Sequence, residues 1–152
     1  MNIEKSFRTS LCIYALIVLM AGVSHGAWYC FLPEYAEMSG LSMQQWNIVF
    51  LFNWSISIAL VFIALLSFAV SRMKVFALIH LRQFSLLTIA LWICRLILEF
   101  VFPVGIPYLI LKNPSWIVRF SILILIAILA HPEIRLRLMR RESSKNDAER
   151  SS

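Results

Sequence analysis

Each of the four apolar segments of this 152-residue chain carries at least one side chain that is costly to place in hydrocarbon. These side chains are His25, Asn53, Arg95 with Glu99, and Arg119. An ionisable group at the centre of a membrane costs roughly 2.5–3.5 kcal/mol on insertion scales unless it is paired or hydrated. One such group in every segment indicates that the side chains act together, as a binding or proton-transfer site.

Arg95 and Glu99 form the most specific pattern. Positions i and i+4 lie on one face of a helix, so the guanidinium and the carboxylate can meet and lower each other's cost of burial. Arg119 then leaves the set with one excess positive charge, because a guanidinium keeps its proton in proteins. A phosphate or carboxylate entering from outside would balance that charge. Two alternatives stay open. The Arg95–Glu99 pair only anchors helix packing, or the long side chain of Arg119 extends its guanidinium to interfacial water.

The other candidates have weaker patterns. His25 can hydrogen-bond to Glu99 or carry a proton, since imidazole titrates near neutral pH. Asn53 can bridge two helices by hydrogen bonds. Trp92 shares the helical face of Arg95 and Glu99 and can wall a ligand pocket. Helix packing is the simpler interpretation of each, so we predict them as secondary ligand-binding residues.

Metal and catalytic signatures are weak in this sequence. His25, His80 and His131 share no spacing that makes a metal site on one helix, and no cysteine lies beside them. We therefore expect neither a metal nor a cofactor, although a b-type haem held by His80 and His131 remains an alternative. Glu99 and His25 suffice for one proton transfer, but they form no catalytic signature. The sequence leans away from an enzyme.

The elements that must position these side chains are membrane-spanning helices. The chain is 61% hydrophobic, whereas soluble domains are about 45–50% apolar. Four apolar stretches are long enough to cross about 30 Å of hydrocarbon, and they lack the alternation typical of transmembrane strands. The predicted spans are residues 11–32, 47–70, 84–102 and 115–131. Counted at about 1.5 Å per residue, the polar side chains lie within one half of the membrane.

The predicted fold class is an all-α integral membrane protein, a four-transmembrane-helix up-down bundle with its polar layer inside. Lys and Arg gather in the N-terminal tail, the second loop and the C-terminal tail, and are nearly absent from the other two loops. The positive-inside rule then makes both termini cytoplasmic (N-in/C-in) and the polar layer external. We therefore expect a multi-pass protein of a cytoplasmic (inner) membrane.

Residues 1–132 are predicted to form the transmembrane domain, and residues 133–152 a basic cytoplasmic tail. The tail is expected to be disordered toward its end, because residues from Ser143 onward have almost no apolar content. The first span has features of a cleavable signal peptide up to Ala27. Its apolar run continues to Leu32, which favours an uncleaved helix.

Our leading hypothesis is a small polytopic protein whose external polar layer binds an amphiphile with an anionic or polar headgroup. The alternatives are an accessory subunit of a larger membrane complex, a membrane enzyme acting on a lipid or isoprenoid, and a haem-binding membrane anchor. The expected partners are a membrane lipid or amphiphile, further copies or a larger complex, and anionic headgroups at the basic tail. The net charge of +6 lies mostly on the predicted cytoplasmic side, so we expect no nucleic acid partner.

Overall fold

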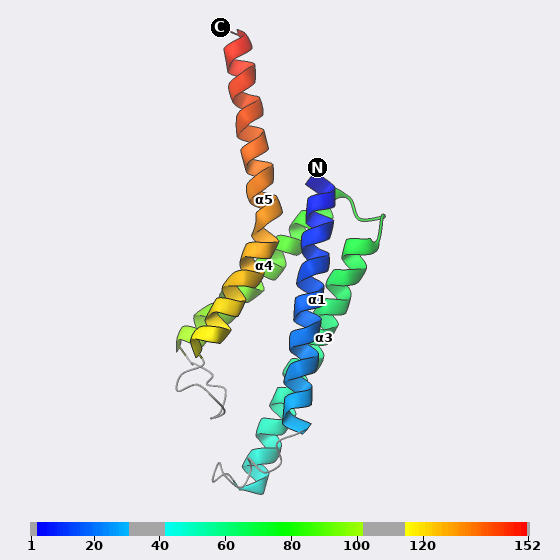
Figure 1. Cartoon of the computed structure of the whole chain (residues 1–152), viewed down its shortest axis with the longest axis vertical. Coiled ribbons are helices and arrows are strands. Elements are labelled where there is room, and N and C mark those ends of the chain that lie inside the picture. Colours follow the sequence, from blue (N-terminus) through cyan, green and yellow to red (C-terminus); the bar gives the residue numbers. More distant parts are fainter. Residues whose placement is uncertain (1–2, 31–41, 102–114, 152) are drawn as a thin grey trace. The chain divides into compact units, whose positions relative to one another are not determined.

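The computed structural model describes residues 3–30, 42–101 and 115–151, which form four long helices and no strand. The helices are α1 (Ile3–Cys30), α3 (Met43–Arg72), α4 (Leu78–Val101) and α5 (Ser115–Ser151), drawn in Figure 1. Each contains a stretch long and apolar enough to cross a membrane. The predicted fold class, an all-α membrane protein with four spanning helices, is confirmed. Most of the first and third predicted loops lies outside the described residues.

The helices extend beyond the predicted spans. α1 begins at Ile3 rather than at residue 11, and α4 begins at Leu78 rather than at residue 84. The added turns carry charged side chains such as Arg8 and Arg82. Hydropathy detects only the part of a helix that lies in hydrocarbon, whereas the backbone continues as a helix into the polar interface.

α5 departs most from the prediction. We expected it to end near His131, ahead of Pro132, but the helix continues to Ser151. Pro132 lacks the N–H that would bond the carbonyl of Ile128, so a bend is expected there, and Figure 1 shows α5 changing direction part-way along its length. Beyond the bend, residues expected to be disordered are helical. Glu, Lys, Arg and Ala favour helix, and extending an existing helix avoids the cost of nucleation.

The chain divides into two compact units. One comprises Met1–Leu11 together with Met73–Ser152, and the other comprises Cys12–Arg72. The first contains α4, α5 and the opening turns of α1, and the second contains α3 and the rest of α1. Successive contacts run in opposite directions along the paired helices: Gly26 lies against Ser57 and Gly22 against Leu60, while Arg82 meets Glu133 and Glu99 meets Arg119. Both helix pairs are therefore antiparallel.

Small residues bring α1 and α3 together in the second unit. A Cβ atom placed on Gly22 would lie 3.0 Å from Leu60 Cβ and 3.2 Å from the Ser57 carbonyl oxygen, and one on Gly26 would lie 3.2 Å from Ser57 Oγ. Carbon atoms in ordinary contact are about 3.5–4.0 Å apart. Glycines four positions apart permit this close approach in membrane helices. α3 carries a stripe of small side chains that are buried, namely Ser57, Ala64, Ser67 and Ser71.

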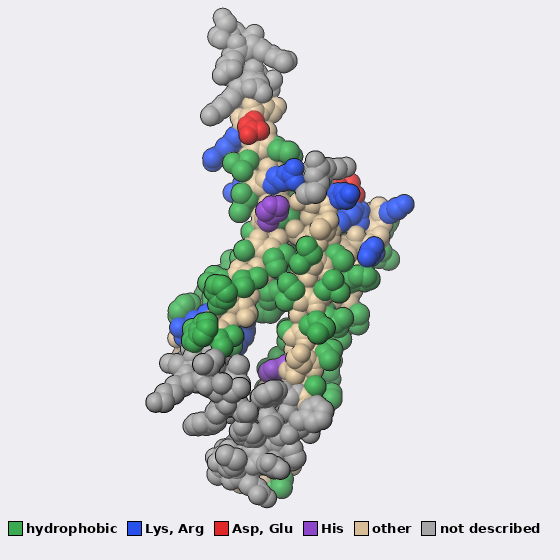
Figure 2. Space-filling view, viewed as in Figure 1, with side chains coloured by type: hydrophobic (Ala, Val, Ile, Leu, Met, Phe, Trp, Pro, Cys, Tyr) green, Lys and Arg blue, Asp and Glu red, His purple; other side chains and the backbone are tan. Residues whose placement is uncertain are grey.

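In the first unit, α4 packs on α5; α4 buries mostly polar side chains (Ser85, Thr88 and Glu99), and α5 buries mostly apolar ones. Ser85 of α4 donates a hydrogen bond to the Leu129 carbonyl (3.3 Å), close to Pro132 inside α5. Arg8 of α1 donates to the carbonyls of Met73 (2.9 Å) and Phe76 (2.8 Å), which ties α1 to the turn before α4. Outward-facing side chains are mostly hydrophobic, as Figure 2 shows, and this is the surface that lipid would cover.

Candidate functional site

The acidic centre of the candidate site is Glu99, near the end of α4. Its side chain is completely buried, and its Oε2 lies 2.7 Å from Nη2 of Arg95, one helical turn earlier. The predicted i, i+4 ion pair is therefore formed. Arg95 is 37% exposed, so the pair places its carboxylate inside the α4–α5 hairpin and its guanidinium at the hairpin surface.

Arg119 of α5 reaches the same turn of α4, but it contacts neutral groups. Its Nη2 donates to the backbone carbonyl of Glu99 (3.3 Å), and its guanidinium lies over the ring of Phe100, 4.3 Å from the centroid. Its Nε is buried and has no hydrogen-bond acceptor among the described residues. A cation over an aromatic face gains about 0.5–2 kcal/mol, but neither the ring nor the carbonyl cancels its charge.

The cluster of Arg95, Glu99, Arg119 and Phe100, here called the arginine cluster, therefore has an excess positive charge. Among the described residues, the cluster contains two guanidinium groups and one carboxylate. An uncompensated charge is costly away from water, and an arginine cannot relieve that cost by losing its proton. Chemically, the arrangement is suited to accept one anionic group beside Arg119.

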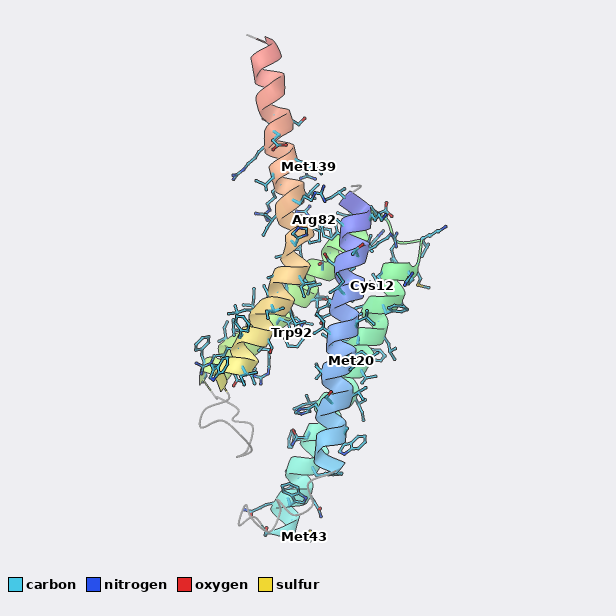
Figure 3. All side chains as sticks on the ribbon, viewed as in Figure 1. Cys12, Met20, Met43, Arg82, Trp92 and Met139 are labelled. Carbon is cyan, nitrogen blue, oxygen red and sulfur yellow. The ribbon has the colours of Figure 1, made fainter. Side chains whose placement is uncertain are left out.

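Trp92, labelled in Figure 3, lies on α4 one turn before Arg95. Its side chain is half-buried. Thr88 and Glu99, which the i, i+4, i+7, i+11 spacing places on the same face, are both buried. The predicted stripe is therefore the face that α4 turns inward. Trp92 lies along this stripe, which keeps it a candidate for the wall of a binding site.

His25 and Asn53 come together in the other unit. The imidazole Nε2 of His25 and the Oδ1 of Asn53 form a 3.1 Å hydrogen bond between α1 and α3, and both side chains are half-buried. One turn further along α3, the hydroxyl of Ser57 is buried and lacks a hydrogen-bond partner among the described residues. The structure thus groups the predicted site residues into two sets, His25 with Asn53, and Arg95, Glu99 and Arg119.

Sequence reasoning missed a second ion-pair cluster in the α4–α5 hairpin. Arg82 of α4 donates through Nε and Nη2 to the two carboxylate oxygens of Glu133, both at 2.7 Å, and Arg137 donates to the same carboxylate at 3.2 Å. Glu133 is only 6% exposed. The available signal was an acidic residue directly after Pro132 in a stretch otherwise rich in arginine.

The two histidines considered for haem, His80 and His131, are both exposed. His80 packs edge-on against the ring of Phe76. Within the described ranges, no three His, Cys, Asp or Glu side chains form a group that could hold a metal ion. No known protein family, curated protein or solved structure matches this chain.

Proposed function

We propose that this chain is a multi-pass membrane protein that binds the anionic headgroup of a lipid-like amphiphile at the arginine cluster. The observation that carries the proposal is the buried Nε of Arg119, which lacks an acceptor among the described residues while its guanidinium rests on a carbonyl and an aromatic ring. A phosphate or carboxylate would supply that acceptor and balance the charge. Arginine suits this task because its planar fork matches both anions.

Each member of the cluster has a distinct role in the proposal. Arg119 contacts the headgroup directly, and Arg95 offers the exposed side of its guanidinium to it. Glu99 is a positioning residue, since its carboxylate holds Arg95 and its carbonyl holds Arg119. His25 and Asn53, which the sequence suggested as further headgroup contacts, are bonded to each other, so the proposal does not depend on them.

The surface beside the cluster suits the apolar tail of an amphiphile. Exposed hydrophobic side chains continue from the cluster along both helices: Ile97 and Phe100 on α4, and Trp116 and Phe120 on α5. An acyl or isoprenoid chain lying there would replace membrane lipid at little cost, since both are hydrocarbon. The distribution of Lys and Arg supports an arrangement with cytoplasmic termini and an external cluster in a cytoplasmic membrane.

The test is native mass spectrometry of the full chain, gently extracted from its own membrane, as wild type, Arg119→Gln and Arg72→Gln. Arg72 is the matched control because its guanidinium also lies over a phenylalanine ring, that of Phe68, at 5.2 Å. We expect wild type and Arg72→Gln to retain the same small amphiphile and Arg119→Gln to lose it. A hydrogen bond to a charged group is worth about 1.5–3 kcal/mol, or about 10-fold to 150-fold in affinity.

Two outcomes would contradict the proposal. Equal retention in all three proteins would show that Arg119 does not hold the ligand. A protein retained in place of an amphiphile would favour the accessory-subunit hypothesis instead. The variant Arg119→Lys refines the result, because it keeps the charge but loses the planar fork. It should bind more weakly than wild type and more tightly than Arg119→Gln.

A further inference from the structure

Beyond its apolar part, α5 continues as a helical segment that we call the α5 arm, residues 133–144. Four of its side chains share one helical face, since they follow positions i, i+3, i+4 and i+7. They are Ile134, Arg137, Leu138 and Arg141, and all four are exposed. Figure 2 shows Lys or Arg and hydrophobic side chains side by side along this part of the molecule, and Figure 3 labels Met139 on it.

The positive charge of the arm is not matched within it. Its four arginines outnumber its two carboxylates, Glu133 and Glu142, and Glu133 is buried and already receives Arg82 and Arg137. Arg137 and Arg141 are like charges at i, i+4, an arrangement that destabilises an isolated helix. An external anion along this face would relieve that repulsion.

The start of the arm is fixed at the end of the hairpin. Glu133 is held at two points by Arg82, close to the first residue of α4, and the apolar part of α5 ends just before it. If α4 and α5 cross the membrane, this end of the hairpin lies at the level of the headgroups. The first two turns of the arm therefore emerge where lipid phosphates are within reach of arginine side chains.

The apolar members of the face indicate what kind of anion it meets. Ile134 is 57% exposed and Leu138 is 52% exposed, each beside an arginine. A soluble polyanion such as nucleic acid would leave both aliphatic side chains in contact with water and phosphate. The interface of a membrane accommodates aliphatic and basic side chains together.

We propose that the α5 arm docks on anionic phospholipid headgroups of the leaflet from which it emerges, through the face of Ile134, Arg137, Leu138 and Arg141. This interaction is separate from ligand binding at the arginine cluster. Each basic residue near an anionic surface strengthens association about fivefold. Removing two of them should therefore weaken docking about 25-fold. High salt should weaken it as well, because the Debye length falls to about 3 Å at 1 M.

The test is hydrogen exchange of the full chain in nanodiscs of phosphatidylcholine alone or mixed with phosphatidylglycerol. We expect amides of the arm to exchange more slowly in the anionic nanodiscs, and the difference to disappear at high salt. The variant Arg137→Gln/Arg141→Gln should remove most of the difference, whereas Arg137→Lys/Arg141→Lys should keep it. The matched control Arg72→Gln/Lys74→Gln also removes two exposed positive charges and should leave the difference unchanged.

Three results would overturn this proposal. Equal exchange in the two nanodiscs would show that the arm ignores lipid charge. Loss of the difference in both the Gln and the Lys variants would assign it to the helix itself rather than to charge. Protection by added RNA in phosphatidylcholine nanodiscs, without protection by phosphatidylglycerol, would make a nucleic acid the partner.

Discussion

Replacing Arg95 by methionine should destabilise the α4–α5 hairpin by about 3 kcal/mol. The Arg95–Glu99 distance of 2.7 Å corresponds to an attraction of about 1.5 kcal/mol in water and about 6 kcal/mol at an effective dielectric constant of 20. Arg95 is 37% exposed while Glu99 is fully buried, which places the pair between these limits. The free energy of unfolding falls because the carboxylate of Glu99 stays buried after its cation is removed.

A double-mutant cycle separates this coupling from the packing of each side chain. The second single variant is Glu99→Leu, and the double variant Arg95→Met/Glu99→Leu replaces the pair by apolar side chains of similar size. Such replacements are often neutral or stabilising. We therefore expect the double variant to unfold at close to the wild-type free energy and the coupling energy to be about 3 kcal/mol.

The free energy of unfolding can be measured by circular dichroism during titration of the detergent-solubilised chain with sodium dodecyl sulfate. Additive effects of the two single substitutions, with a coupling below about 0.5 kcal/mol, would refute the reasoning. The stable double variant also separates fold from function. It should retain less of the amphiphile than wild type although its hairpin is intact, because only one of the two guanidinium groups of the cluster remains.

Two further predictions concern contacts between helices. Gly22→Val should weaken packing of α1 on α3 by about 1–3 kcal/mol, because a Cβ at this position would lie 3.0 Å from Leu60 Cβ. The control is Ala21→Val, at an exposed position of α1, which should show little change in the same titration. Arg82→Gln should speed amide exchange around Pro132 and the base of the α5 arm, since it removes both hydrogen bonds from Arg82 to a buried carboxylate. Unchanged exchange there would show that Arg137 alone holds Glu133.

Features that depend on neighbouring residues in one helix could be predicted from the sequence. The Arg95–Glu99 pair follows directly from the spacing of four, and the spans follow from the length of the apolar runs. The close approach at Gly22 and Gly26 could have been found as well, because the same spacing of four marks small-residue helix interfaces.

Features that depend on how two helices meet could not be predicted. Arg119 donates to the backbone carbonyl of Glu99, twenty positions earlier in the chain. No local sequence pattern indicates that contact. The predicted fourth span ends directly before Pro132, and proline usually ends or kinks a helix. In this chain Pro132 is buried in the α4–α5 hairpin, and the residue after it is fixed by Arg82. Tertiary contacts therefore outweigh the local preference of proline.

The hydrogen bonds of Arg8 have a consequence for the order in which the chain assembles. Their acceptors, the carbonyls of Met73 and Phe76, lie 65 and 68 positions later in the sequence. During synthesis the ribosome makes α1 first, yet its opening turns lack these acceptors until α3 and the following turn have also emerged. The N-terminal end of α1 thus reaches its final contacts only after α3 and the turn before α4 have been made.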